Sequence, residues 1–282
     1  MIIIDYNGIA IGNIVVQKIE PDENLIRHMI LNSIRMYRQK FKEYGEVVIV
    51  GDGKGNWRKD VYPQYKHSRK KSRDDSKLDW QEVFRLTNLV RDELRDNFPY
   101  KVLHVEGCEA DDVIAHVALT TQEFGNHEDV MIVSADKDFI QLQKYDNIRQ
   151  YSPMTKKFVK DPNPRLYLQH HIMKGDAGDG VPNILSDDNV FVEGRRQTPL
   201  TKKKIEAWLE AEDLQAVMPE DVYRNYCRNK KMIDFTETPQ PVIENIINNY
   251  EGSDPSKNKG KVFPYLVNKR CKLLLESVQE FI

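Results

Sequence analysis

The chain has 282 residues, 40% of them hydrophobic and 30% charged, which fits a folded globular protein and not a disordered one. The formal net charge of -2 excludes a uniformly basic nucleic-acid binder, but it allows acidic and basic patches that balance each other. Three cysteines without close spacing give no sign of a disulfide framework or a zinc site, and no apolar run approaches membrane-spanning length. The acid at Asp5 interrupts the apolar start, so we expect no signal peptide and a cytoplasmic location.

Apolar runs that predict buried strands recur along the chain, and each of the first four is followed by carboxylates. These runs and their acids are Ile2 to Ile4 with Asp5, Val47 to Val50 with Asp52, Lys101 to Val105 with Glu109, Asp111 and Asp112, and Val130 to Ser134 with Asp136 and Asp138. After the first run, Tyr6 to Gly8 have the composition of a turn. Because the carboxyl ends of parallel strands meet at one sheet edge, the acids are expected to share a crevice there.

Helical periodicity separates these strands. Apolar residues recur at three and four positions over 22–44 and 79–98, and again after Glu109. Alternating strands and helices predict an α/β fold with a parallel-dominated central sheet flanked by helices. Acids near the start of the helix after Glu109 also suit simple capping, but three acids together make capping alone an insufficient explanation.

A fifth acid group follows a further short strand over 148–151 and a helix over 166–173. It is the glycine-rich turn that carries Asp176 and Asp179. The neighbouring His170 and His171 point in different directions on a helix, so we interpret them as structural residues and not as metal ligands.

The segment over 54–78 is predicted to be a basic insert. Cations mixed with aromatic rings suit a nucleic-acid backbone with bases available for stacking, while the alternative is a solvated charged loop. The candidate nucleic-acid contacts in it are Arg58, Lys59, Tyr62, Tyr65, Lys66, Arg69, Lys70 and Lys71.

Beyond Pro182 strand signals stop and the chain becomes helical. Thr201 is a good N-cap, yet Lys202, Lys203 and Lys204 occupy the first turn, where the helix dipole disfavours cations. This indicates either a phosphate site or a poorly optimised surface helix. We therefore predict a nuclease domain over 1–182 and a smaller helical, duplex-DNA-binding region over 183–282.

So many carboxylates in one crevice would repel each other without cations. Their oxygen ligands favour Mg²⁺, with Mn²⁺ as a substitute, over zinc. Two such ions activate water and stabilise the leaving oxygen in a phosphoryl displacement. With a basic insert beside the crevice, a nucleic-acid phosphodiester is the expected substrate.

The ordered motifs resemble the flap endonuclease and 5′-nuclease family, whose fold is PIN-like, and within it the ribonuclease H subgroup of T-even bacteriophages. The motifs that carry this resemblance are Ile4-Asp5, Gly51-Asp52, Tyr65 to Arg69, Glu109 to Ala115, Ser134 to Leu142, Gly175 to Asp179, Met232 to Phe235 and Gly260 to Tyr265. One departure is that the residues after Gly180 lack the glycine-rich duplex-gripping motif of cellular relatives, so Arg195, Arg196 and Lys202 to Lys204 are expected to replace it.

The resemblance implies a 5′ to 3′ exonuclease that also cuts flaps and removes RNA primers during phage DNA replication in the host cytoplasm. It implies a first metal near Asp5, Asp52, Glu109, Asp111, Asp112 and Asp136, and a second near Asp138, Asp176 and Asp179. Lys66 and Arg69 match residues that neutralise the scissile phosphate. The expected substrates are RNA/DNA hybrids and forked or flapped duplexes. A monomer is expected, with a single-stranded-DNA-binding protein or a sliding clamp as replication partner.

Two alternative functions remain open at this point. A phosphatase with an Asp-x-Asp nucleophile should carry its paired acids after the first strand, where this chain has Asp5-Tyr6-Asn7. A catalytically silent nucleic-acid-binding relative should lose acids first, and the acid set here is nearly intact.

Overall fold

The structure is a computed structural model that describes residues 1–17, 22–69, 75–76, 78–122 and 125–282. The described residues form one six-stranded sheet in the order β3-β2-β1-β4-β5-β6. Its strands are β1 (Ile2–Asp5), β2 (Val47–Gly51), β3 (Lys101–His104), β4 (Val130–Val133), β5 (Ile148–Ser152) and β6 (Lys157–Val159). All neighbours pair in parallel except β5 and β6, so the predicted parallel-dominated α/β fold is confirmed.

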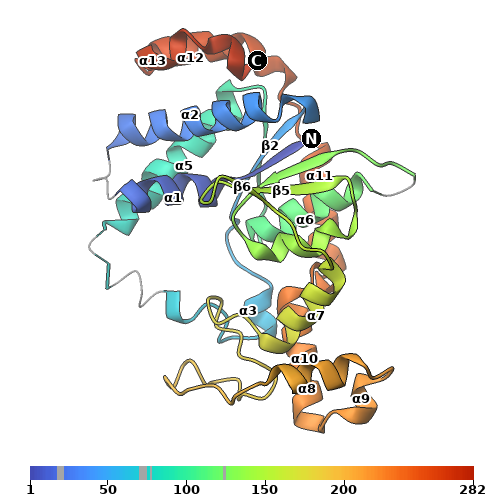
Figure 1. Ribbon diagram of the computed structural model, residues 1–282. Helices are drawn as coiled ribbons and strands as arrows, with labels where there is room; N and C mark the ends of the chain where they lie inside the picture. Colours follow the sequence, from blue (N-terminus) through green and yellow to red (C-terminus); the bar gives the residue numbers. More distant parts are fainter. Residues whose placement is uncertain (18–21, 70–74, 77, 123–124) are drawn as a thin grey trace.

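Helices connect the parallel strands and also make up most of the chain after β6 (Figure 1). Those before β5 are α1 (Tyr6–Gln17), α2 (Glu23–Lys40), η1 (Lys42–Tyr44), α3 (Arg58–Val61), α5 (Trp80–Asn97), α6 (Ala110–Thr120) and η2 (Lys137–Lys144). Those after β6 are α7 (Pro164–Lys174), α8 (Lys202–Leu209), α9 (Leu214–Val217), α10 (Glu220–Ile233), η3 (Phe235–Glu237), α11 (Gln240–Glu251), η4 (Ser256–Lys261), α12 (Val262–Asn268), α13 (Lys272–Leu275) and η5 (Val278–Phe281).

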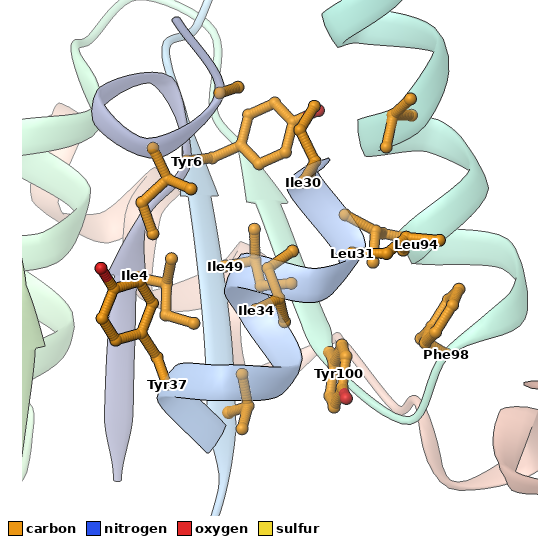
Figure 2. Close-up of a cluster of buried hydrophobic side chains, with 14 of the residues drawn as sticks. Ile4, Tyr6, Ile30, Leu31, Ile34, Tyr37, Ile49, Leu94, Phe98 and Tyr100 are labelled. Atoms are coloured by element: carbon orange, nitrogen blue, oxygen red, sulfur yellow. The ribbon is translucent and has the colours of Figure 1, made fainter. Parts of the chain in front are cut away.

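Helices cover both faces of the sheet, because alternate residues of each strand point to opposite sides. Ile2 and Ile4 of β1 pack against α1, α2 and α5, a cluster that Figure 2 shows in close-up. Ile3 lies on the other face, among residues of α6, η2 and α11. Two apolar faces account for the nearly continuous hydrophobic runs of β1, β2 and β4 in the sequence.

The structure differs from the sequence prediction at the end of β1. Tyr6 to Gly8 were predicted to be a turn, but they are the first residues of α1. The backbone N–H of Gly8 donates to the Asp5 carboxylate at 2.9 Å, which satisfies a donor at the helix start, and Ile9, Ala10 and Ile14 are buried in the core. The acid that ends the strand therefore also begins the helix.

The last third of the chain divides into two parts. Helices α8, α9 and α10 pack with the end of α7 through a separate small core, and Figure 1 shows them at the opposite end of the molecule from α12 and α13. After α10 the chain returns to the sheet, where α11 packs on α6. The last part of the chain forms α12, α13 and η5, and the Tyr100 hydroxyl donates to the carbonyl of Phe281 at 2.9 Å. No helix in the described parts of the chain has the length and hydropathy that a membrane span requires.

Candidate functional site

Four carboxylates meet at the carboxyl edge of the sheet, and we call them the first acid group: Asp5, Asp52, Asp111 and Asp136. Asp5 ends β1, Asp52 follows β2, and Asp136 follows β4, while Asp111 lies in the first turn of α6. The Ser134 hydroxyl donates to Asp5 at 2.8 Å, and the Asn7 amide donates to Asp52 at 2.5 Å. The predicted convergence of strand-end acids is thus what the sheet topology produces.

These carboxylates disfavour each other's ionisation. Desolvation, followed by the charge of Asp136, raises the pKa of Asp111 well above its ordinary value. Desolvation and the charge of Asp138 raise the pKa of Asp136 to about 6. Desolvation also raises the pKa of Asp5, and the charge of Asp52 adds to the effect. A divalent cation bound between these carboxylates would offset their repulsion and stabilise the site.

Close packing of the two loops after β2 and β3 holds Asp52 in place. A Cβ atom on Gly53 would lie 1.7 Å from the carbonyl oxygen of Val105, so only glycine allows this approach. The approach brings Asp52 to the N-terminus of α6, where the backbone N–H of Ala110 donates to its carboxylate at 3.0 Å. The helix N-terminus therefore stabilises one charge of the first acid group.

A second cluster contains Asp138, His171 and Asp176. The Nε2 atom of His171 lies 2.8 Å from Asp138 Oδ1 and 4.0 Å from Asp176 Oδ2. One ligand atom from each residue lies within 4.8 Å of the others, a spacing that suits a shared metal ion. Burial of the imidazole disfavours its protonation, but the hydrogen bond to Asp138 and the two negative charges outweigh this and raise the pKa of His171.

His171 is the candidate ligand that sequence reasoning missed, since it was interpreted as structural. It lies in the last turn of α7, and Gly175 then turns the chain so that Asp176 comes back towards the ring. Gly175 has a φ of +67°, and a Cβ there would lie 2.4 Å from the carbonyl oxygen of Val181. A histidine in the last turn of a helix that ends directly in Gly-Asp is the signal that was available in the sequence.

Glu109 and Asp179, two predicted metal ligands, form ion pairs with Lys66 and Arg69. Lys66 pairs with Glu109 and lies 3.3 Å from Asp179, and Arg69 donates to Asp179 at 2.5 Å. The Tyr65 hydroxyl bridges both acids, at 2.8 Å from Glu109 and 2.9 Å from Asp179. Burial opposes ionisation of Asp179, but Lys66 and Arg69 outweigh it and lower its pKa. The structure thus places Lys66 and Arg69 beside Glu109 and Asp179, while their predicted contact with the scissile phosphate stays a prediction.

Asp112, which follows Asp111 in the first turn of α6, is fully buried. Its two carboxylate oxygens accept hydrogen bonds from the Arg58 guanidinium at 2.8 Å each, and the Trp57 indole donates a further one at 3.1 Å. This arrangement contradicts the predicted metal-binding role of Asp112, because both of its carboxylate oxygens already accept hydrogen bonds within the protein. It also contradicts the predicted nucleic-acid contact of Arg58, whose guanidinium is buried. Both residues are therefore excluded from the candidate site.

The two tyrosines of the basic insert are also buried, and their rings do not face solvent. Tyr62 is 3% exposed and Tyr65 is 4% exposed, in a small core with Ile172, Val181 and Met232. The predicted stacking on unpaired bases is therefore contradicted by their positions. The exposed predicted contacts are Lys59, Arg69, Arg195, Arg196, Lys202, Lys203 and Lys204, while Lys70 and Lys71 lie outside the described residues.

Comparisons with known proteins show which family the sequence matches. Residues 10–168 match the family described as 5′-3′ exonuclease, N-terminal resolvase-like domain, and residues 162–281 match T4 RNase H, C terminal. The chain is 34% identical over 294 residues to the ribonuclease H of Enterobacteria phage T4, covering 99% of this chain and 95% of that protein. It is 30% identical over 179 residues to the flap endonuclease Xni of Shewanella denitrificans, covering 58% of this chain and 65% of that protein.

Among solved structures, the chain is similar to the bacteriophage T5 flap endonuclease in a pseudo-enzyme-product complex with DNA and metal ions. The TM-score is 0.64 at 15% sequence identity, and the match covers 89% of this chain and 97% of that chain. At this identity the likeness concerns the fold, which is shared over most of both chains.

Proposed function

The chain belongs to the 5′-3′ exonuclease family, and from this we propose that it is a metal-dependent nuclease that hydrolyses nucleic-acid phosphodiesters from the 5′ end. The resemblance inferred from the sequence motifs is confirmed by the two family matches. The observation that carries the proposal is the sheet edge where the first acid group lies, with Lys66 close enough to Asp111 to lower its pKa and with Arg69 beside Lys66.

We assign the first metal ion to Asp5, Asp52, Asp111 and Asp136. Hard carboxylate oxygens at a common edge fit Mg²⁺, and Mn²⁺ accepts the same ligands. When bound, such ions supply an activated water and charge stabilisation for the leaving oxygen. The chain's own contribution is to hold the carboxylates in place: Ser134 orients Asp5, and Asn7 with the N-terminus of α6 orients Asp52.

Lys66 and Arg69 are assigned to the scissile phosphate. In the absence of substrate they pair with Glu109 and Asp179, which keeps both cations at the crevice. A phosphate that enters competes for the same donors. Fixed positive charge near the phosphate then stabilises the negative charge that develops in the transition state.

The exposed cations after Pro182 are assigned to the duplex. Lys202, Lys203 and Lys204 are exposed in the first turn of α8, and the N-terminus of a helix favours a bound phosphate. Because the chain returns to the sheet after α10, we shorten the proposed duplex-binding region from residues 183–282 to residues 183–233. Arg195 also belongs to this region, although it pairs with Glu193 and Asp187 in the structure.

The proposed substrates are RNA/DNA hybrid, duplex DNA and 5′-flapped DNA, and the proposed role is primer removal in phage replication. Two relatives support this choice by name, one being a ribonuclease H and the other a flap endonuclease. We also propose that the protein is a monomer. A single-stranded-DNA-binding protein or a sliding clamp would recruit it.

A cleavage assay tests the proposal. The protein is incubated with 5′-labelled flap, RNA/DNA hybrid and blunt duplex substrates, with Mg²⁺, with Mn²⁺ and with chelator. We expect short 5′ products only when a divalent ion is present. Binding without cleavage under all conditions would point to a silent relative, and release of inorganic phosphate alone would point to a phosphatase.

A further inference from the structure

The second cluster has the spacing of a coordination site with mixed ligands. Ligands about 2.1 Å from a common ion are separated by about 3.0 to 4.2 Å in the usual geometries. The two separations at the His171 ring are 2.8 Å to Asp138 and 4.0 Å to Asp176, close to this range. The three residues come from η2, from α7 and from the turn after α7, so separate segments converge on one point.

The surrounding contacts keep these three side chains in place. Asp176 Oδ1 accepts hydrogen bonds from the backbone N–H groups of Gly178 and Asp179, so its Oδ2 atom is the one directed at His171. The His171 ring lies 5.8 Å from the ring of Tyr167, centroid to centroid, and α7 packs against η2. His171 is only partly exposed, and its Nε2 atom faces the acids.

Asp179, in contrast, is engaged elsewhere. Arg69, Lys66 and Tyr65 all contact its carboxylate, so its charge is neutralised within the protein. The structure therefore offers an imidazole nitrogen where the sequence prediction placed a third carboxylate.

We propose that His171 is a ligand of the second metal ion, with Asp138 and Asp176, and that this nitrogen makes the site select Mn²⁺ over Mg²⁺. The inference rests on the proposed nuclease function only in so far as that function calls for a second ion. Imidazole suits transition metals, whereas Mg²⁺ prefers oxygen ligands and retains its waters. The second ion is then the one that sets the metal preference of the enzyme, because the first acid group offers oxygen alone.

Pulsed electron paramagnetic resonance of the Mn²⁺-loaded protein tests the proposal directly. Modulation from a directly bound imidazole ¹⁴N is expected in the native protein, and it should change to the ¹⁵N pattern when the histidines are labelled with ¹⁵N. This measurement needs no substitution and no substrate. Two bound Mn²⁺ ions without any nitrogen coupling, or no bound Mn²⁺ at all, would overturn the assignment.

The variant H171Q tests whether the coupled nitrogen belongs to His171, and H170Q is the matched control on the same helix. We expect H171Q to lose the nitrogen modulation and to bind the second Mn²⁺ at least about tenfold more weakly by calorimetry, since even outer-shell partners contribute about 10- to 100-fold. H170Q should keep both properties. Nitrogen coupling that persists in H171Q excludes His171 as the ligand.

The outcomes separate this inference from the proposed function. If metal-dependent cleavage is observed but nitrogen coupling is not, the nuclease proposal stands and the role of His171 is rejected. If nitrogen coupling is observed but no substrate is cleaved with any ion, the metal site stands and the nuclease proposal is rejected.

Discussion

The guanidinium of Arg58 donates to both carboxylate oxygens of Asp112, at 2.8 Å each, and neither side chain is more than 3% exposed. Arg58 also donates to the carbonyl of Met232 at 2.8 Å. One buried ion pair thus joins the basic insert, the first turn of α6 and the end of α10. Its role is structural, although both residues belong to segments that carry the chemistry.

Substitution of Arg58 by alanine should lower the free energy of unfolding without removing a metal ligand. R58A leaves the Asp112 carboxylate buried and unpaired, which typically costs about 3 to 5 kcal/mol. Urea denaturation should show this loss in the free energy of unfolding. Calorimetry on D112N at low temperature should still count the same number of bound Mn²⁺ ions as in the native protein, and a missing ion would return Asp112 to the ligand set.

Substitution of Asp136 should separate catalysis from stability. D136N removes a proposed ligand and should lower the cleavage rate by more than about 100-fold, beyond the usual range of outer-shell changes. It also removes a charge that its neighbours disfavour, so the metal-free variant should melt at a higher temperature than the metal-free native protein. Thermal melts with and without Mg²⁺ measure both effects, and undiminished cleavage would reject the assignment.

Lys66 should affect turnover more than affinity. In K66A the phosphate loses a fixed charge whose contribution is greatest in the transition state, so kcat should fall by about 100-fold or more while KM changes little. The matched control is K42A, since Lys42 is exposed in η1, before β2 and away from the crevice. A defect confined to KM would make Lys66 a general phosphate contact.

Glu93 should make the fold sensitive to acid. Burial opposes its ionisation, but hydrogen bonds from Arg27, Lys269 and Tyr265 outweigh this and lower the pKa of Glu93. The resulting stability is fully present above the unfolded pKa of about 4.3 and is lost as the pH falls through the lower folded value. The difference in unfolding free energy between native protein and E93Q should be large at pH 7 and shrink below about pH 4. A difference that does not change with pH would contradict the ionic role.

Features encoded by neighbouring residues were predictable from the sequence. The first four strands are short apolar runs next to acids, and the order of those acids follows from the sheet topology. Helix α1 was missed because Tyr6 to Gly8 resemble a turn. The donor that begins this helix bonds to Asp5, a residue that the prediction used only as a strand end.

Contacts between distant segments were not predictable in this way. Tyr62 is buried in a core with Ile172 and Val181, and its hydroxyl donates to the carbonyl of Asp188, 126 residues later in the chain. Arg58 and Asp112 are 54 residues apart, and composition alone placed the arginine in a solvent-exposed insert. His171 meets Asp138 only after η2 and α7 have packed together, so the single histidine of the candidate site had no local signal strong enough to outweigh the structural interpretation.

The position of β1 has a consequence for synthesis of the protein. Its residues are made before those of β2 and β4, yet Ile2 pairs with Met131 of β4 on one side and with Val47 of β2 on the other. One hydrogen-bonding edge of β1 therefore stays without its partner until β4 has been made. Because long-range parallel pairing is slow, this interval is when the nascent chain is most exposed to aggregation. The strand that ends in Asp5 is thus a part of the chain that a chaperone would protect during synthesis.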